Sequence, residues 1–254
     1  MAQTYDYIIV GGGSAGCVLA NRLSANSEVS VLLLEAGGSG RSVFVDMPSA
    51  FAIPMASKEF NWGFFSEPER GLDGRPMDAA RGRGLGGSSA INGMVYVRGH
   101  PGDFDEWETL GAEGWNYAGC LPYFQRAETW MHGGDDYRGG DGPVGTCNGN
   151  NRKNPLYQAF VDAGEEAGYG LTDDYNGFRQ EGFGPMHMTV KDGMRSSTRR
   201  AYLEAARSRP NLTVITRAEV ECVGLEAGVA RTVAYWRHGS RQEVVAKQEI
   251  ILSA

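Results

Sequence analysis

A strand, a glycine-rich turn and a helix at the start of the chain constrain its fold more than any other feature. The apolar run Tyr7–Val10 leads into Gly11-Gly12-Gly13-Ser14-Ala15-Gly16, and small residues predict a helix over about Ala15–Ser24. A second apolar run, Val29–Leu34, ends in Glu35. Strand, glycines, helix, strand and acid in this order are typical of a dinucleotide-binding βαβ unit. A tight turn without a ligand would explain one or two glycines, but not the closing carboxylate.

Each residue of the pattern has a physical role. Gly11 permits a tight turn after the strand, Gly13 lets the backbone approach a pyrophosphate, and Gly16 allows the helix to pack closely on the sheet. The helix N-terminus offers backbone N–H groups and a positive dipole end to phosphate. We expect Glu35 to accept hydrogen bonds from both ribose hydroxyls.

A second glycine-rich segment spans residues 81–95. Gly86 and Gly87 precede two serines, so backbone N–H groups and hydroxyls can face an anion, and Arg81 and Arg83 add positive charge. Residues 88–92 could open a short helix toward the same diphosphate. The alternative is a flexible surface loop, which the apolar residues 94–97 that follow at once argue against.

Together these segments resemble the glucose–methanol–choline (GMC) oxidoreductases, in particular the branch of choline and alcohol dehydrogenases. The matching stretches are the first glycine unit through Glu35-Ala36-Gly37, residues 82–92, and residues 96–107. The likeness extends over the whole chain as an amino-terminal half. It implies FAD as cofactor and oxidation of a primary alcohol by hydride transfer to the flavin N5 atom.

The resemblance also implies the cofactor-binding residues. The first turn would hold the pyrophosphate, residues 86–88 the diphosphate and ribityl chain, and residues 92–95 the isoalloxazine ring, with Gly93 near N5. Trp62 would lie beside the cofactor, although a core tryptophan is an equal alternative, and the backbone of Val220 would contact the adenine edge. The full set is Gly11, Gly13, Ser14, Ala15, Gly16, Glu35, Ala36, Trp62, Arg83, Gly86, Gly87, Ser88, Asn92, Gly93, Met94, Val95 and Val220.

Ile91 occupies the position at which some relatives attach the flavin covalently through a histidine. An isoleucine cannot form that bond, so we expect non-covalent, dissociable FAD.

The remaining segments predict two helices and a run of strands. Asn154 and Pro155 open a helix to about Gly168, and a second helix, basic on one side, covers about Thr198–Arg207. The β-branched run Leu212–Thr216 suits a buried parallel strand. The predicted strands after it are 220–225, 231–237, 242–245 and 249–253, the first three forming an antiparallel meander and the last returning to the parallel sheet.

The expected fold class is therefore α/β: an FAD-binding, Rossmann-like parallel sheet with an antiparallel β-meander, plus part of a smaller α+β substrate domain. Residues 1–150 and 211–254 would form a discontinuous FAD-binding domain, with flavin-covering loops over about 60–100. Residues 151–210 would belong to the substrate domain.

No catalytic residue is assigned. The resemblance places the catalytic base in a carboxy-terminal part that this chain does not contain, so a complementing segment or polypeptide would supply it, and the fragment alone would be inactive. The histidines His100, His132, His187 and His238 fall outside the expected context, and we expect each in a surface or loop position.

Composition limits the partners. A net charge of −7 with dispersed Lys and Arg argues against nucleic acid, and no long apolar run predicts a membrane span or signal peptide. The four cysteines are widely spaced, which predicts neither a disulfide framework nor a metal site and fits a reducing cytoplasm. The expected partner is a small alcohol. Alternatives are an FAD-bearing lyase of the same fold, a non-catalytic FAD-binding fragment, and an NAD-dependent dehydrogenase.

Overall fold

A computed structural model describes residues 3–149 and 154–254 of the chain. Its Cα packing divides the chain into two compact units. We call Met1–Gly93 with Ser197–Ala254 the sheet unit, and Met94–Ser196 the insert unit. This division differs from the predicted boundaries, because residues 94–149 pack with the insert and residues 197–210 pack with the sheet.

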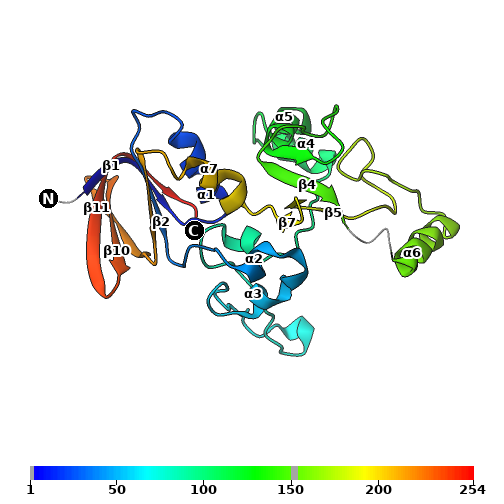
Figure 1. Cartoon of the computed structure of the whole chain (residues 1–254), viewed down its shortest axis with the longest axis horizontal. Coiled ribbons are helices and arrows are strands. Elements are labelled where there is room, and N and C mark those ends of the chain that lie inside the picture. The colour runs from blue at the N-terminus through cyan, green and yellow to red at the C-terminus, as the bar shows by residue number, and fades with distance from the viewer. Residues whose placement is uncertain (1–2, 150–153) are drawn as a thin grey trace. The chain divides into compact units, whose positions relative to one another are not determined.

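The sheet unit is built on a six-stranded mixed sheet with the order β8-β2-β1-β11-β10-β9. The first four strands in this order run parallel, and β11, β10 and β9 pair antiparallel. In Figure 1 the blue strand β1 and the red strand β11 mark the beginning and end of the chain within this sheet. The strands are β1 (Gln3–Val10), β2 (Val31–Glu35), β8 (Leu212–Thr216), β9 (Glu219–Glu226), β10 (Val229–Arg237) and β11 (Ser240–Leu252). The predicted α/β class with a parallel sheet is confirmed.

Alternation of side chains along β1 supplies both hydrophobic faces of the sheet. Ile8 and Val10 pack into one buried cluster with side chains of β10 and β11, whereas Ile9 packs into the other. That second cluster includes Cys17 and Ala20 of helix α1 (Ser14–Leu23). The helix therefore covers one face directly behind the first glycine turn.

Strand β11 is longer than predicted, because residues 242–245 and 249–253 were expected as separate strands. One strand of 13 residues pairs with β10 at its start and with β1 along most of its length. The pairing with β1 shifts between Tyr5 and Tyr7, which lie opposite Ala246 and Glu249. This irregularity accommodates exposed polar residues that interrupt the apolar pattern without ending the strand.

The predicted helix over Thr198–Arg207 is shorter and irregular, because it begins as a π-helical turn. Its first residue, Arg199, is buried and pairs with Asp46 and Glu204, so its charge faces inward. The other helical segments of this unit are α2 (Val43–Asp46), α3 (Ala52–Ala56), α7 (Glu204–Ala206), the π-helical turn Arg199–Leu203 and the 3₁₀ turns Pro48–Ala50, Arg70–Leu72 and Gly87–Ala90.

In its described residues, 94–149 and 154–196, the insert unit combines three α-helices with short strands. Asn154 caps α6 by accepting a hydrogen bond from the Leu156 N–H, as predicted from its sequence. The elements are α4 (Pro101–Thr109), α5 (Tyr117–Ala127), β3 (Glu128–Trp130), β4 (Val144–Asn148), α6 (Pro155–Glu166), β5 (His187–Met188), β6 (Val190–Lys191) and β7 (Met194–Arg195). Strands β3, β4 and β5 form one small sheet, and β6 and β7 form another.

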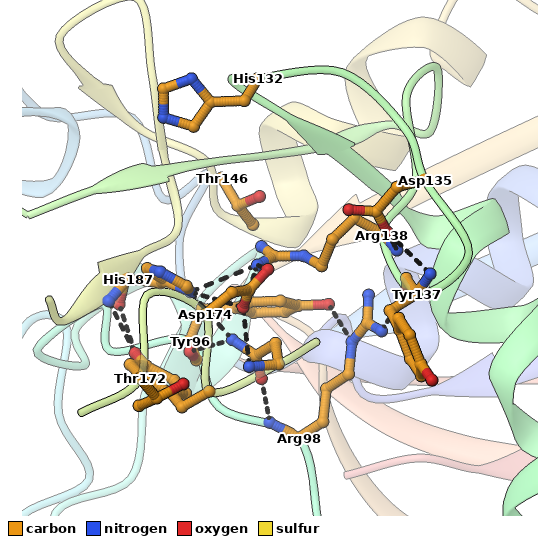
Figure 2. A network of polar contacts seen from close by, with 12 residues as sticks. Tyr96, Arg98, His132, Asp135, Tyr137, Arg138, Thr146, Thr172, Asp174 and His187 are labelled. Atoms are coloured by element: carbon orange, nitrogen blue, oxygen red, sulfur yellow. Dashed lines mark hydrogen bonds and ion pairs between the residues drawn. The ribbon is translucent and has the colours of Figure 1, made fainter. Parts of the chain in front are cut away.

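A network of buried charges holds the insert unit together (Figure 2). The Glu128 carboxylate is fully buried and accepts hydrogen bonds from Arg98 at 2.7 Å and Arg138 at 2.6 Å. Arg138 also donates to both carboxylate oxygens of Asp174 at 2.8 Å. His187, which was expected at the surface or in a loop, is instead fully buried on β5 with its Nδ1 atom 3.3 Å from Arg138. That expectation was wrong because the ring stacks between Tyr175 and this network.

Within the ranges 3–149 and 154–254, no helix has the length and apolar character needed to cross a bilayer.

Candidate functional site

The first glycine turn has the backbone geometry that its sequence predicts. Gly11 follows β1 with φ +95°, a conformation that L side chains rarely adopt. A Cβ atom on Gly16 would lie 1.9 Å from the Gly11 carbonyl oxygen, so only glycine lets α1 approach the sheet this closely. Gly13 occupies the N-cap of α1 and provides no side-chain cap. The first N–H groups of this helix therefore remain available to an anion.

The second glycine segment lies directly against the first. The Gly86 N–H donates to the Gly12 carbonyl oxygen at 2.8 Å. A Cβ atom on Gly87 would lie 2.7 Å from the Gly13 Cα atom, so the two backbones are in van der Waals contact. The two clusters of small residues, about 70 positions apart in the sequence, thus form one surface.

Glu35 connects both segments from the end of β2. Its carboxylate is buried and accepts hydrogen bonds from the N–H groups of Gly12 and Gly37, both at 2.7 Å, and of Gly84 at 2.9 Å. One acidic side chain therefore fixes three glycine-containing loops. A carboxylate has about four lone-pair positions, so it keeps capacity for a further donor.

These loops enclose a cleft of about 590 Å³ in the sheet unit. Its size lies in the range of ligand pockets, which is about 300–1,000 Å³. Nine of the 17 predicted site residues line it: Gly11, Gly13, Ser14, Glu35, Ala36, Trp62, Gly87, Ser88 and Val220. The cleft therefore brings together residues from both glycine segments, the end of β2 and the start of β9.

The other predicted residues lie outside the lining. Ala15 is exposed on the first turn of α1, while Gly16 and Gly86 are buried behind the cleft. Arg83 lines a neighbouring pocket of about 390 Å³. Asn92 and Gly93 are exposed at the boundary of the sheet unit, and Met94 and Val95 belong to the insert unit.

Aromatic residues form part of the cleft wall. Trp62 is 39% exposed and stacks on Phe64 with 5.8 Å between ring centroids. It is therefore not a core tryptophan. The Arg83 guanidinium lies 4.9 Å from the Trp62 ring centroid, which orients the indole through a cation–π contact.

Arg81, which the sequence indicated as a source of positive charge, also lines the cleft. The sequence did not single out other lining residues, among them Phe64, Ala218, Glu219 and Ser253. Phe64 lies two residues after Trp62, so its proximity was the one available signal. The others reach the cleft through long-range strand pairing that no local pattern indicates.

Cys17 lies just behind the turn but is not a reactive group of the cleft. Burial raises the pKa of its thiol to about 11, and its Sγ atom donates to the Gly12 carbonyl oxygen at 3.2 Å. It packs as a small apolar side chain.

Comparison with known proteins identifies several that are similar to this chain. An oxygen-dependent choline dehydrogenase from Photobacterium profundum is 60% identical over 100% of this chain and 45% of its own length. The solved structure of pyridoxine 4-oxidase from Mesorbium loti superposes with a TM-score of 0.91 at 36% identity, covering 98% of this chain and 49% of that one. An FAD-dependent oxidoreductase from Chaetomium thermophilum gives a TM-score of 0.89 at 31% identity, covering 98% and 45%.

The chain thus spans about half the length of these relatives. Residues 5–254 match the family described as GMC oxidoreductase. With its family match, its relatives and its two adjoining glycine segments in agreement, the chain belongs to the GMC oxidoreductase family.

Proposed function

We propose that this chain forms the FAD-binding part of an oxidoreductase that oxidises a primary alcohol. The observation that supports this most is the joining of both glycine segments around one cleft that ends at Glu35. FAD, when bound, would supply the acceptor of a hydride from the alcohol carbon. The relatives' printed names, choline dehydrogenase, pyridoxine oxidase and FAD-dependent oxidoreductase, agree with this class of chemistry.

The residues of the cleft fit such a cofactor. A Cβ atom on Gly13 would meet nothing closer than the Ser253 carbonyl oxygen at 3.8 Å, so the space in front of this residue is open. The uncapped N-terminus of α1 suits the diphosphate, and Glu35 suits the adenosine ribose. Gly93 has no atom within 4 Å of its Cβ position, which leaves the room that the hydride-accepting face of a flavin needs.

Residue 91 supports a dissociable cofactor. Ile91 is buried with Val45 and Ala90 and has no nucleophilic atom. We therefore expect FAD to leave the polypeptide on denaturation.

We further propose that the base which accepts the alcohol proton comes from residues outside these 254. None of the four histidines belongs to the lining of the described cleft, and the relatives are about twice as long as this chain. We also propose that residues 1–150 and 211–254 serve as the FAD-binding domain and residues 151–210 as part of the substrate domain. The proposed substrate is a small alcohol, and the proposed location is the cytoplasm.

The test is FAD binding to the purified 254-residue chain, measured by flavin fluorescence and by equilibrium dialysis. Gly13→Ala should weaken binding by about tenfold or more, because the added methyl group occupies the phosphate-facing side of the cleft. The matched control is Gly71→Ala, since a Cβ atom there meets nothing within 4 Å and Gly71 is not among the residues that line the cleft. Equal affinities of the two variants for FAD would contradict the proposed site.

Once FAD is bound, a test of flavin reduction distinguishes an alcohol-oxidising enzyme from a lyase or an inert fragment. With a complementing carboxy-terminal segment, anaerobic addition of an alcohol should bleach the visible flavin spectrum. A lyase or an inert FAD-binding fragment predicts no bleaching by any alcohol. Robust alcohol turnover by the 254-residue chain alone would refute the proposal that the catalytic base comes from outside these residues.

A further inference from the structure

Another pocket of the sheet unit gathers arginine side chains beside the glycine cleft. Its volume is about 390 Å³, and we call it the arginine pocket. Its basic and acidic lining residues are Arg83, Arg217, Arg237, His238, Glu59 and Glu219. The function proposed above assigns no ligand to this pocket.

Backbone contacts between distant segments bring these side chains together. The Arg217 N–H donates to the Gly37 carbonyl oxygen at 2.8 Å, and a Cβ atom on Gly37 would lie 2.6 Å from the Arg83 carbonyl carbon. Strands β9 and β10 pair Glu219 with Trp236, which directly precedes the third arginine. The three arginines therefore reach the pocket from separate segments that are fixed against one another.

The guanidinium groups of the arginine pocket lack acidic partners. Within residues 3–149 and 154–254, no ion pair involves Arg83, Arg217 or Arg237. The Nε atoms of Arg83 and Arg237 are shielded from solvent and have no hydrogen-bond partner among these residues. A donor that has lost water without gaining an acceptor is unfavourable. An anion in the pocket would offer acceptors to these guanidinium groups through charge-assisted hydrogen bonds.

The charge of this pocket is opposite in sign to that of the whole chain. Three arginines and two glutamates leave a formal charge of +1 with His238 neutral, whereas the chain carries −7. The planar guanidinium presents paired N–H donors that match the oxygens of a phosphate. The carboxylates of Glu59 and Glu219 can accept hydrogen bonds from hydroxyl groups of the same ligand. This combination favours a phosphate that carries O–H donors over a simple halide.

Two of the lining residues hold left-handed backbone conformations. Arg217 has φ +55° between β8 and β9, and His238 has φ +49° in the turn between β10 and β11. Glycine adopts this conformation most easily, and a two-residue hairpin turn favours Asn or Gly at the position of His238. Backbone strain of this kind concentrates at ligand sites, which agrees with a binding role for the pocket.

We propose that the arginine pocket binds a phosphate group, either the free ion or the phosphate of a small monoester. Arg217 and Arg237 supply positive charge, and Glu219 accepts a hydrogen bond from a hydroxyl of the ligand. The pocket adjoins the glycine cleft, because Ala36 and Glu219 line both. Its ligand is nevertheless distinct from FAD, so occupancy of the pocket requires no flavin.

The test titrates the flavin-free 254-residue chain with sodium phosphate at constant ionic strength, by calorimetry and by broadening of the phosphate NMR line. We expect saturable binding that weakens when the titration is repeated at higher ionic strength. Arg217→Gln and Arg237→Gln should each weaken phosphate binding by about three- to tenfold. The matched control is Arg207→Gln, which removes the same charge from an exposed residue of the sheet unit outside the lining. It should bind phosphate as the parent does.

A second titration with glycerol phosphate distinguishes the two sources of the phosphate group. Tighter binding of this monoester than of inorganic phosphate would assign the pocket to a phosphorylated small molecule, because its hydroxyls can reach the glutamates. Equal or weaker binding would assign it to the free ion. Either result retains the site, provided that the arginine variants weaken both ligands.

Three results would overturn the proposal. One is the absence of saturable phosphate binding, and another is full affinity in the Arg217→Gln, Arg237→Gln double variant with its fold verified by circular dichroism. The third is a loss of phosphate affinity in Gly13→Ala but not in the arginine variants, which would place the ion at helix α1. Because the titrations contain no flavin, failure of FAD binding does not affect their outcome.

Discussion

The two units organise polar groups in opposite ways. In the sheet unit, backbone N–H groups and missing side chains shape an open cleft, and one carboxylate, Glu35, fixes three loops. In the insert unit, long charged side chains around Glu128 and Arg138 are sealed away from solvent. The comparison indicates that the first arrangement is suited to receiving a ligand, whereas the second is suited to holding short strands and loops in place.

The largest expected effect comes from a substitution that breaks the buried network. Glu128→Gln removes the charge that balances both Arg98 and Arg138, and leaving a buried charge without its partner costs about 3–5 kcal/mol. Denaturant unfolding of the variant measures this loss. Glu166→Gln is the control, because this glutamate is exposed on the same unit, and it should change stability by less than about 0.5 kcal/mol. Similar small changes in both variants would mean that the network is not a source of stability.

A smaller effect distinguishes Gly16, which is needed for packing, from Gly13, which we propose to face the ligand. Gly16→Ala places a methyl group 1.9 Å from the Gly11 carbonyl oxygen, so we expect a net loss of about 1–3 kcal/mol in the free energy of unfolding. Gly13→Ala meets ordinary contact distances and should melt within a few degrees of the parent while losing FAD affinity. Thermal unfolding without FAD compares the two. A larger loss for Gly13→Ala would reverse this assignment of roles.

The smallest expected effect is a difference in cysteine reactivity, which leaves the fold intact. With its thiol pKa raised to about 11 by burial, Cys17 is only roughly 1% thiolate at about pH 9. Iodoacetamide at that pH should label exposed Cys222 quickly and Cys17 slowly, as mass-spectrometric mapping can measure. Full labelling of both in guanidinium chloride is the control. Fast labelling of native Cys17 would show that the cluster behind the glycine turn opens readily.

The contrast between the sheet unit and the insert unit also explains which features the sequence predicts. In the first βαβ unit, helix α1 and strand β2 were predicted within about two residues, whereas β1 begins at Gln3, earlier than the predicted Tyr7. Strand Leu212–Thr216 was predicted with its observed bounds, because local periodicity encodes it. Nine of the 17 predicted site residues line one cleft for the same reason. Their contacts with FAD remain predictions.

The insert network was not predicted, and the reason is physical. Arg98, Glu128, Arg138, Asp174 and His187 are scattered through the sequence, and each alone has the character of a surface residue. Only tertiary packing makes them partners. The length of β11 was missed because Lys247, Gln248 and Glu249 are exposed beside an irregular pairing with β1.

Strand β11 links the two ends of the chain within one sheet. Its start pairs with the hairpin partner β10, and its later residues pair with β1. Directly after it, the Ser253 hydroxyl donates to the Gly11 carbonyl oxygen at 2.9 Å. Loosening the carboxy-terminal hairpins would therefore remove support from the first glycine turn, so the β-meander stabilises a loop of the cleft to which it contributes few atoms.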